Sequence, residues 1–169
     1  MKLLRNISNF WLATLLILTC CLDVGDSGPS FEQQLKMDLD TIDAYLEDNN
    51  IDALQDPNNL IRYVIHDEGN GASPTLSNCV TTSYKGMFFD GGTFDQSTGI
   101  SFPLNGVIAG WQVGMQQLQN GDSATLYIPS GLGYGTQGRP GIPANANLIF
   151  NVRLKYIGTT YDGSTGTCL

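Results

Sequence analysis

The stretch that decides the fold lies near the C-terminus and reads Asn147-Leu-Ile-Phe-Asn-Val-Arg-Leu-Lys-Tyr-Ile157. Apolar and polar side chains alternate along it. One face collects Leu148, Phe150, Val152, Leu154 and Tyr156, and the other collects Asn151, Arg153 and Lys155. Alternation over this length predicts a β-strand with one buried face and one solvent-exposed face. Such strands are typical of antiparallel sheets.

The same two-residue period returns in three earlier stretches, residues 60–66, 79–89 and 123–129. Between them one short helix is expected over residues 107–118, where four apolar side chains share one side and Asn120-Gly121 supplies a stop. These four side chains are Ile108, Trp111, Met115 and Leu118. We therefore expect an α+β domain in which an antiparallel sheet buries one face against one short helix.

A second helix is predicted near the N-terminus, over residues 31–50. Its apolar side chains recur at helical spacing, at Phe31, Leu35, Leu39, Ile42 and Leu46. Ser30 is its expected N-cap, and Gln33 completes a capping-box pattern. The apolar face of this helix is expected to be buried, either against the same domain or against a second copy of the chain. We favour the same domain.

Residues 1–21 have the composition of an export signal. Lys2 and Arg5 precede a short apolar core that is too short for a comfortable membrane span. The run Leu18-Thr19-Cys20-Cys21 resembles a bacterial lipobox, so we expect a signal peptide with lipidation at Cys20 or Cys21. Plain secretion and a retained anchor helix are the alternatives. Residues 22–30 are expected to form a polar tether.

Composition limits the function classes. Of the 169 residues, 41% are hydrophobic and 14% are charged, which excludes a disordered polyampholyte and a multi-span membrane protein. The net charge is −8, and the sequence has no basic stripe. A nucleic-acid partner is therefore not expected, and we expect membrane contact only through the possible lipid anchor.

The chain also lacks the usual signatures of metal, nucleotide and nucleophile chemistry. His66 is the only histidine, so we expect no metal site and no Ser–His–acid triad. The run Gly133–Gly138 satisfies G-x-G-x-x-G, but two prolines follow where a nucleotide-binding helix would have to begin. We expect no cofactor. Cys79 and Cys168 could form one disulfide in an oxidising compartment, or remain as two thiols.

Several segments match one known family in order. They are Tyr84–Met87, Gly92–Ser97, Phe102–Trp111, Tyr127–Gly135 and Gly141–Val152. Together they resemble the FKBP family of peptidyl-prolyl isomerases, over about residues 60–157. The resemblance implies a half-open antiparallel sheet wrapped around one short helix. It implies an isomerase domain at 57–158, between an N-terminal helical extension at 31–56 and a Gly/Ser/Thr tail at 159–169.

The resemblance also implies a proline pocket with Trp111 as its floor. The residues with implied catalytic roles are Tyr84, Phe94, Asp95, Trp111, Tyr134 and Phe150. The residues with implied substrate-binding roles are Phe102, Val107, Ile108 and Ile142, and the Ile108 backbone N–H would donate to the peptide. The chain departs from the best-known members at Arg139, where they often carry His. This change affects the rim and therefore specificity and drug affinity more than activity.

The implied activity is peptidyl-prolyl cis-trans isomerisation of proline-containing polypeptides, with macrolides as further possible ligands. Rotation of an X–Pro bond needs no nucleophile, because an apolar pocket with a few hydrogen bonds can favour the twisted amide. The exported form with an N-terminal helix looks like the envelope FKBPs of Gram-negative bacteria, in the periplasm or at the outer membrane. The alternative is a weakly catalytic chaperone or a proline-peptide binding module of the envelope.

Overall fold

The structure is a computed structural model that describes residues 28–169, so the expected signal peptide with Cys20 and Cys21 lies outside the described residues. The helices are α1 (Phe31–Asp48) and α2 (Ala109–Met115), with short 3-10 turns η1 (Leu104–Gly106), η2 (Ser130–Leu132) and η3 (Gly135–Gln137). The strands are β1 (Leu54–Gln55), β2 (Arg62–Asp67), β3 (Cys79–Met87), β4 (Thr93–Pro103), β5 (Ser123–Ile128), β6 (Leu148–Gly158), β7 (Tyr161–Asp162) and β8 (Thr167–Cys168). The first six strands form one sheet in the order β1-β2-β5-β6-β3-β4, and every neighbouring pair is antiparallel.

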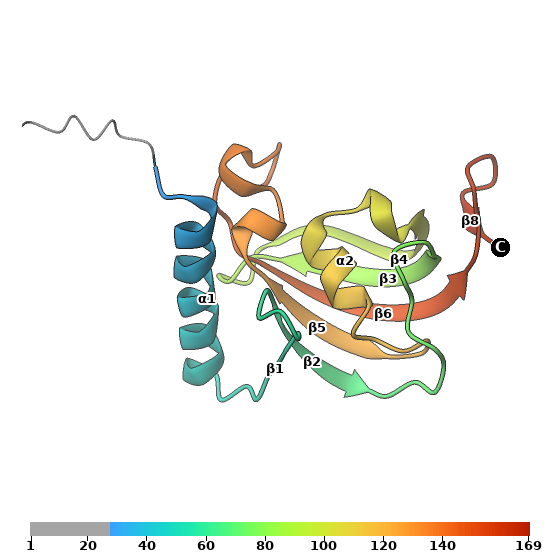
Figure 1. The fold of residues 1–169 in the computed structure, drawn as a ribbon, viewed down its shortest axis with the longest axis horizontal. Coiled ribbons are helices and arrows are strands. Elements are labelled where there is room, and N and C mark those ends of the chain that lie inside the picture. The colour runs from blue at the N-terminus through green and yellow to red at the C-terminus, as the bar shows by residue number, and fades with distance from the viewer. Residues whose placement is uncertain (1–27) are drawn as a thin grey trace, which may run out of the picture.

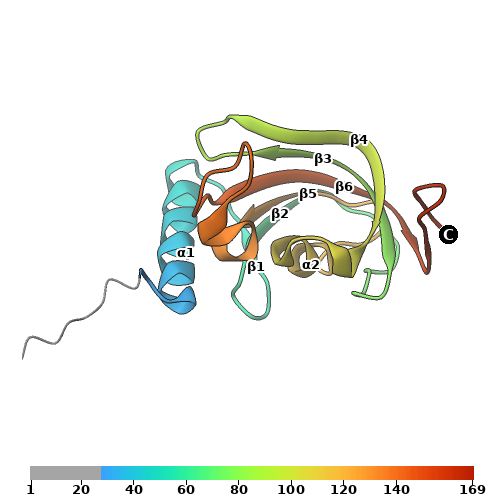
Figure 2. The same ribbon diagram turned by 90° about the horizontal axis from the view of Figure 1, so that it is seen from above.

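The sheet bends over α2, which lies on its concave side (Figure 2). The buried side of α2, with Trp111 and Met115, packs on apolar residues of β5 and β6 such as Leu126 and Leu148. Gly110 allows this close approach, because a Cβ at that position would collide with the side chain of Ile128. The prediction of an α+β fold, with an antiparallel sheet wrapped around a short helix, is confirmed.

Helix α1 covers part of the opposite face of the sheet, at one end of the molecule (Figure 1). The predicted capping box is present, since the Ser30 side chain accepts from the Gln33 N–H and the Gln33 side chain accepts from the Ser30 N–H. Ile42 and Leu46 pack with Tyr127 of β5 and with Ile149 of β6. The helix therefore packs on its own domain. At its start, Phe31 is 55% exposed, so the buried stripe is shorter than the sequence pattern.

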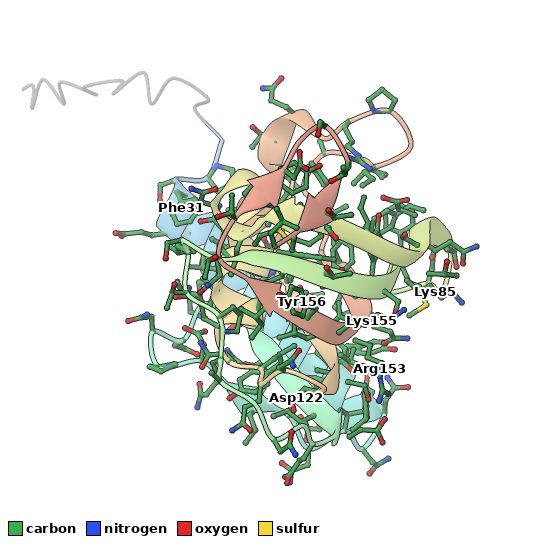
Figure 3. All side chains as sticks on the ribbon, turned by 90° about the vertical axis from the view of Figure 1, so that its right-hand side faces the viewer. Phe31, Lys85, Asp122, Arg153, Lys155 and Tyr156 are labelled. Atoms are coloured by element: carbon green, nitrogen blue, oxygen red, sulfur yellow. A yellow bond between two sulfur atoms is a disulfide. The ribbon has the colours of Figure 1, made fainter. Side chains whose placement is uncertain are left out.

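Strand β6 contains an irregularity that reverses its alternation. Thr82 of β3 pairs with Leu154, but Thr81 pairs with Tyr156, so Lys155 is an extra residue in β6. After this bulge Tyr156 points outward and is 46% exposed, while Ile157 packs against the core. The prediction that Tyr156 lies on the buried face is therefore wrong. Figure 3 shows Tyr156 on the outside, near Lys155 and Arg153.

Two parts of the sheet region have no clear signal in the sequence. β4 is a sheet edge of eleven residues without a continuous buried face, so it shows no regular alternation. The tail is not free of structure, because β7 and β8 form a small separate sheet. A disulfide joins Cys168 of β8 to Cys79 of β3. The tail is thus bonded covalently to the main sheet.

Within residues 28–169, neither helix combines the length and the apolar character that a membrane crossing requires. Over the same range, histidine, cysteine and acidic side chains do not gather in a group that could hold a metal ion.

Candidate functional site

A cavity of about 410 Å³ opens between α2, the concave side of the sheet and the loop after β5. Its lining residues are Tyr84, Asp95, Ile100, Phe102, Gly106, Val107, Ile108, Trp111, Tyr134, Arg139 and Phe150. Eight of the residues assigned from the family resemblance are among them, although they come from five separate segments of the chain. The fold therefore brings most of the predicted pocket together.

Aromatic rings form the deepest part of this cavity. The Trp111 ring lies 5.1 Å from Tyr84, 5.4 Å from Phe102 and 5.2 Å from Phe150, measured between centroids. The contacts with Tyr84 and Phe150 are edge-to-face, an arrangement that aromatic pairs favour. Trp111 is only 5% exposed, and no residue within 28–169 accepts a hydrogen bond from its buried Nε1–H. The rings offer a ligand a rigid apolar surface.

Phe94 and Ile142 do not line the cavity. Phe94 is partly exposed and packs edge-to-face on Phe150, 5.5 Å away, so it supports this lining ring from the side. Gly86 on β3 leaves room for this contact, because a Cβ there would lie 2.7 Å from the Phe94 ring and 2.9 Å from Phe150. Ile142 is 4% exposed and belongs to the core. The resemblance places both residues in the pocket wall, whereas in the structure Phe94 is partly exposed beside the lining and Ile142 is buried in the core.

Three lining residues are not in the predicted set of site residues, namely Ile100, Gly106 and Arg139. In the sequence, Arg139 stands out only because it differs from the His that family members often carry at the rim. Ile100 stands alone among polar residues of an edge strand, so no periodicity marks it. Gly106 contributes backbone alone. Their position follows from the path of the chain rather than from a local pattern.

Polar groups connect across the rim of the cavity. The Tyr84 hydroxyl donates to Asp95 Oδ2 at 2.8 Å, and Arg139 Nη2 lies 3.7 Å from the same oxygen. The Arg139 guanidinium also stacks over the Tyr134 ring, 4.6 Å from its centroid. Arg139 therefore links the loop after β5 to β4. Both members of the Arg139–Asp95 pair are partly exposed, so the pair contributes little to stability.

Besides the buried Nε1–H of Trp111, the backbone N–H of Ile108 and the hydroxyl of Tyr134 have no acceptor at the cavity within residues 28–169. Ile108 is the N-cap residue of α2, so its N–H precedes the hydrogen bonds of the helix. A bound peptide carbonyl could accept from either group. The site thus combines apolar rings with a small number of free donors, as small-molecule and peptide pockets commonly do.

The pKa of Tyr84 is raised to about 12. Burial is the largest cause, and the hydrogen bond to Asp95 and the negative charge of Asp95 add to it. Asp95→Asn should lower this pKa toward the ordinary value of about 10 without reaching it, because burial persists. Ultraviolet absorbance follows the ionisation of tyrosines. Subtracting the titration curve of the variant from that of the wild type isolates the change at Tyr84. An unchanged Tyr84 titration would contradict the assigned hydrogen bond.

The same shift fixes the direction of a pH effect on stability. A tyrosine in the unfolded chain loses its proton near pH 10, whereas Tyr84 in the folded chain keeps it to about pH 12. Between these values the unfolded state binds fewer protons, so the free energy of unfolding falls as the pH rises. Below pH 10 the Tyr84 contribution is fully present. Denaturant unfolding at several pH values measures the slope.

His66 lies on the other face of the sheet, where its Nε2 hydrogen bonds Thr125 Oγ1 at 2.7 Å. This face also carries Lys85, Arg153 and Lys155 (Figure 3), in an open polar groove. The groove contains no cluster of rings comparable to the one around Trp111. The histidine is therefore part of the outer surface of the sheet, and the cavity beside α2 is the candidate site.

Comparisons with known proteins point to the same region. The family model of the FKBP-type peptidyl-prolyl cis-trans isomerases matches residues 71–155. The probable FKBP-type peptidyl-prolyl cis-trans isomerase FkpA of Neisseria meningitidis is 40% identical over 122 residues, covering 69% of this chain and 45% of that protein. FK506-binding protein 1 of Gibberella zeae is 40% identical over 102 residues, covering 54% of this chain and 92% of that protein.

Among solved structures, FkpA from Escherichia coli aligns with a TM-score of 0.64 at 32% identity, covering 75% of this chain and 62% of that one. The chain spans less than half the length of the Neisseria relative. The segment that the family model matches nevertheless includes β3, β4, α2, β5 and most of β6, and it holds the whole lining of the cavity. By its sequence and its fold, the chain belongs to the family of FKBP-type peptidyl-prolyl cis-trans isomerases.

Proposed function

We propose that the chain is a peptidyl-prolyl cis-trans isomerase that acts on proline-containing polypeptides during their folding. The observation that carries this proposal is the cavity of about 410 Å³ whose floor and walls are the rings of Trp111, Tyr84, Phe102 and Phe150. A prolyl ring is compact and apolar, and such a surface suits it. Family membership adds independent support.

The proposed mechanism needs no covalent step. Resonance opposes rotation about a peptide bond with a barrier of about 18–20 kcal/mol, while the two X–Pro isomers differ by only about 0.5–1 kcal/mol. Twisting localises the nitrogen lone pair and makes the amide less dipolar. An apolar cavity solvates the planar, dipolar amide less well than the twisted one, so its binding energy is greater in the transition state.

Polar groups of the rim would orient the substrate. The Ile108 N–H and the Tyr134 hydroxyl are free to donate to peptide carbonyls, which would hold the backbone in a turned form. The Tyr84 hydroxyl is already engaged with Asp95, so its role would be to fix the wall rather than to contact the peptide. Phe94 would support the Phe150 ring that it contacts, and Ile142 would act from the core through its neighbours.

A protease-coupled assay on a short X–Pro peptide tests the proposal. The chain should accelerate the slow cis-to-trans phase in proportion to its concentration, because that phase takes tens to hundreds of seconds without a catalyst. Rates that are the same with and without the chain would contradict the proposal. Saturable peptide binding without acceleration of isomerisation would instead indicate a binding module or chaperone.

We propose two finer properties. The chain covers 92% of a relative named for binding FK506, so a macrolide should occupy the same cavity and inhibit the assay competitively. The leader at residues 1–21 supports export to the envelope of a Gram-negative bacterium, in the periplasm or at the outer membrane, with a lipid on Cys20 or Cys21. Mass spectrometry of the mature N-terminus would distinguish a lipidated cysteine from a free amino group.

A further inference from the structure

The pocket depends on a long loop that is contacted by α1, a helix outside the segment that the family model matches. This loop, residues 130–147, connects β5 to β6 and carries Tyr134 and Arg139 of the cavity lining. It contains only the two short turns η2 and η3 and no strand of the main sheet. Leu132 and Ile142 pack the loop on the core and a backbone bridge joins Arg139 to Ile142, while polar side-chain contacts hold the two ends of the loop.

Asp38, in the middle of α1, makes the most buried polar contact between this loop and another element. Its side chain is 4% exposed, and its Oδ2 accepts from the Ser130 N–H at 2.9 Å and from the Ser130 hydroxyl at 2.6 Å. Its other oxygen accepts from Gln34 Nε2 at 2.8 Å. Ser130 is the first residue of the loop and is fully buried. Hydrogen bonds to a carboxylate are stronger than neutral ones.

The C-terminal end of the loop contacts the same two residues, Ser130 and Asp38. Asn147 Oδ1 accepts from the Ser130 N–H at 3.0 Å, and Asn147 Nδ2 donates to the Asp38 carbonyl at 3.5 Å. The ring of Phe31, at the start of α1, lies against Gly131. Both ends of the loop are therefore held together at Asp38, on a helix outside the segment that the family model matches.

We propose that Asp38 is a positioning residue for the peptide-binding cavity, which it serves by fixing the two ends of the loop 130–147 through Ser130. This inference rests on the proposed function, because it concerns how that cavity is kept ready to bind. Without the carboxylate the loop would spend less time in the binding-competent arrangement. The apparent affinity for peptide would fall by the same fraction.

The test is Asp38→Ala in the full chain, with Asp43→Ala as the matched control. Asp43 also joins α1 to the domain, by accepting from Arg62 Nε at 2.7 Å and Nη2 at 2.9 Å, but it contacts β2 rather than the loop. Asp38→Ala should raise KM for an X–Pro peptide about five- to tenfold and leave kcat within about twofold. Asp43→Ala should leave both constants within about twofold.

Amide hydrogen exchange of the loop supplies a readout that does not depend on catalysis. Asp38→Ala should speed exchange within residues 130–147 by about tenfold, and Asp43→Ala should not, because opening of the loop follows the lost contact. Ser130→Ala, which removes only the hydroxyl, should give a smaller change in the same direction. It serves as the second variant if Asp38→Ala does not fold.

Equal acceleration of loop exchange by Asp38→Ala and Asp43→Ala would overturn the assignment, since the effect would then be general loosening of α1. Unchanged loop exchange in both Asp38→Ala and Ser130→Ala would overturn it as well. An inactive wild type would contradict the proposed function but not the role of Asp38, because the exchange comparison would still support or overturn that role.

Discussion

Replacing Trp111 with leucine should lower kcat/KM for an X–Pro peptide by about 30- to 100-fold, which corresponds to about 2–3 kcal/mol of lost transition-state binding. The indole touches three other rings of the cavity, so leucine removes the floor on which the prolyl ring would rest. Leucine keeps the position apolar and limits the damage to the core. The protease-coupled assay, run well below the melting temperature of both proteins, measures the change.

Tyr156→Leu is the matched control for this substitution. Tyr156 is also a large aromatic residue of the sheet region, but the bulge in β6 turns it outward and it is 46% exposed. Its replacement should leave kcat/KM within about twofold, because exposed positions away from a site have small effects. Similar losses in the two variants, or full activity in Trp111→Leu, would show that the cavity is not where the peptide reacts.

Replacing Asp56 with alanine should destabilise the fold by about 3–4 kcal/mol, because buried N–H groups that lose their acceptor cost about 1–3 kcal/mol each. Asp56 is 2% exposed, and its carboxylate accepts from the backbone N–H groups of Asn58 at 2.9 Å, Leu60 at 2.6 Å and Ile61 at 2.8 Å. These bonds shape the turn that leads from α1 into β2. Denaturant unfolding under oxidising conditions gives the free energy.

Asp52→Ala provides the reference for Asp56, since Asp52 lies in the same connecting segment and is exposed. Its replacement should change the free energy of unfolding by less than about 0.5 kcal/mol. If Asp56→Ala cost less than about 1 kcal/mol, water would have to replace the carboxylate at all three amides, and the turn would not depend on it.

Much of the fold could be predicted from the sequence because its regular elements bury one face. The period of two in β6 from Phe150 to Lys155 and the spacing of four in α1 follow from that burial, and the Ser30 cap is a local contact. β4 escaped prediction because an edge strand with little buried surface has no alternation to detect. Tyr156 was misplaced because the bulge depends on the register with β3, which a single strand does not encode.

The site was predictable only through the resemblance of whole segments. For any single apolar residue, burial in the core was the simpler interpretation, and Ile142 is indeed buried in the core, while Phe94 is a partly exposed neighbour of the lining ring Phe150. No local pattern could indicate the contact between Asp38 and Ser130, because the two residues are 92 positions apart and each resembles an ordinary polar residue. Such contacts are set by how α1 packs on the sheet.

The bond between Cys79 and Cys168 changes what a protease can achieve at the end of the chain. The residues between β7 and β8 are exposed and accessible to cleavage. A single cut there adds the mass of one water molecule, yet the final fragment stays attached through its sulfur. Nicked and intact molecules would therefore migrate together in electrophoresis without thiols. Only a reductant would separate the clipped peptide from the rest.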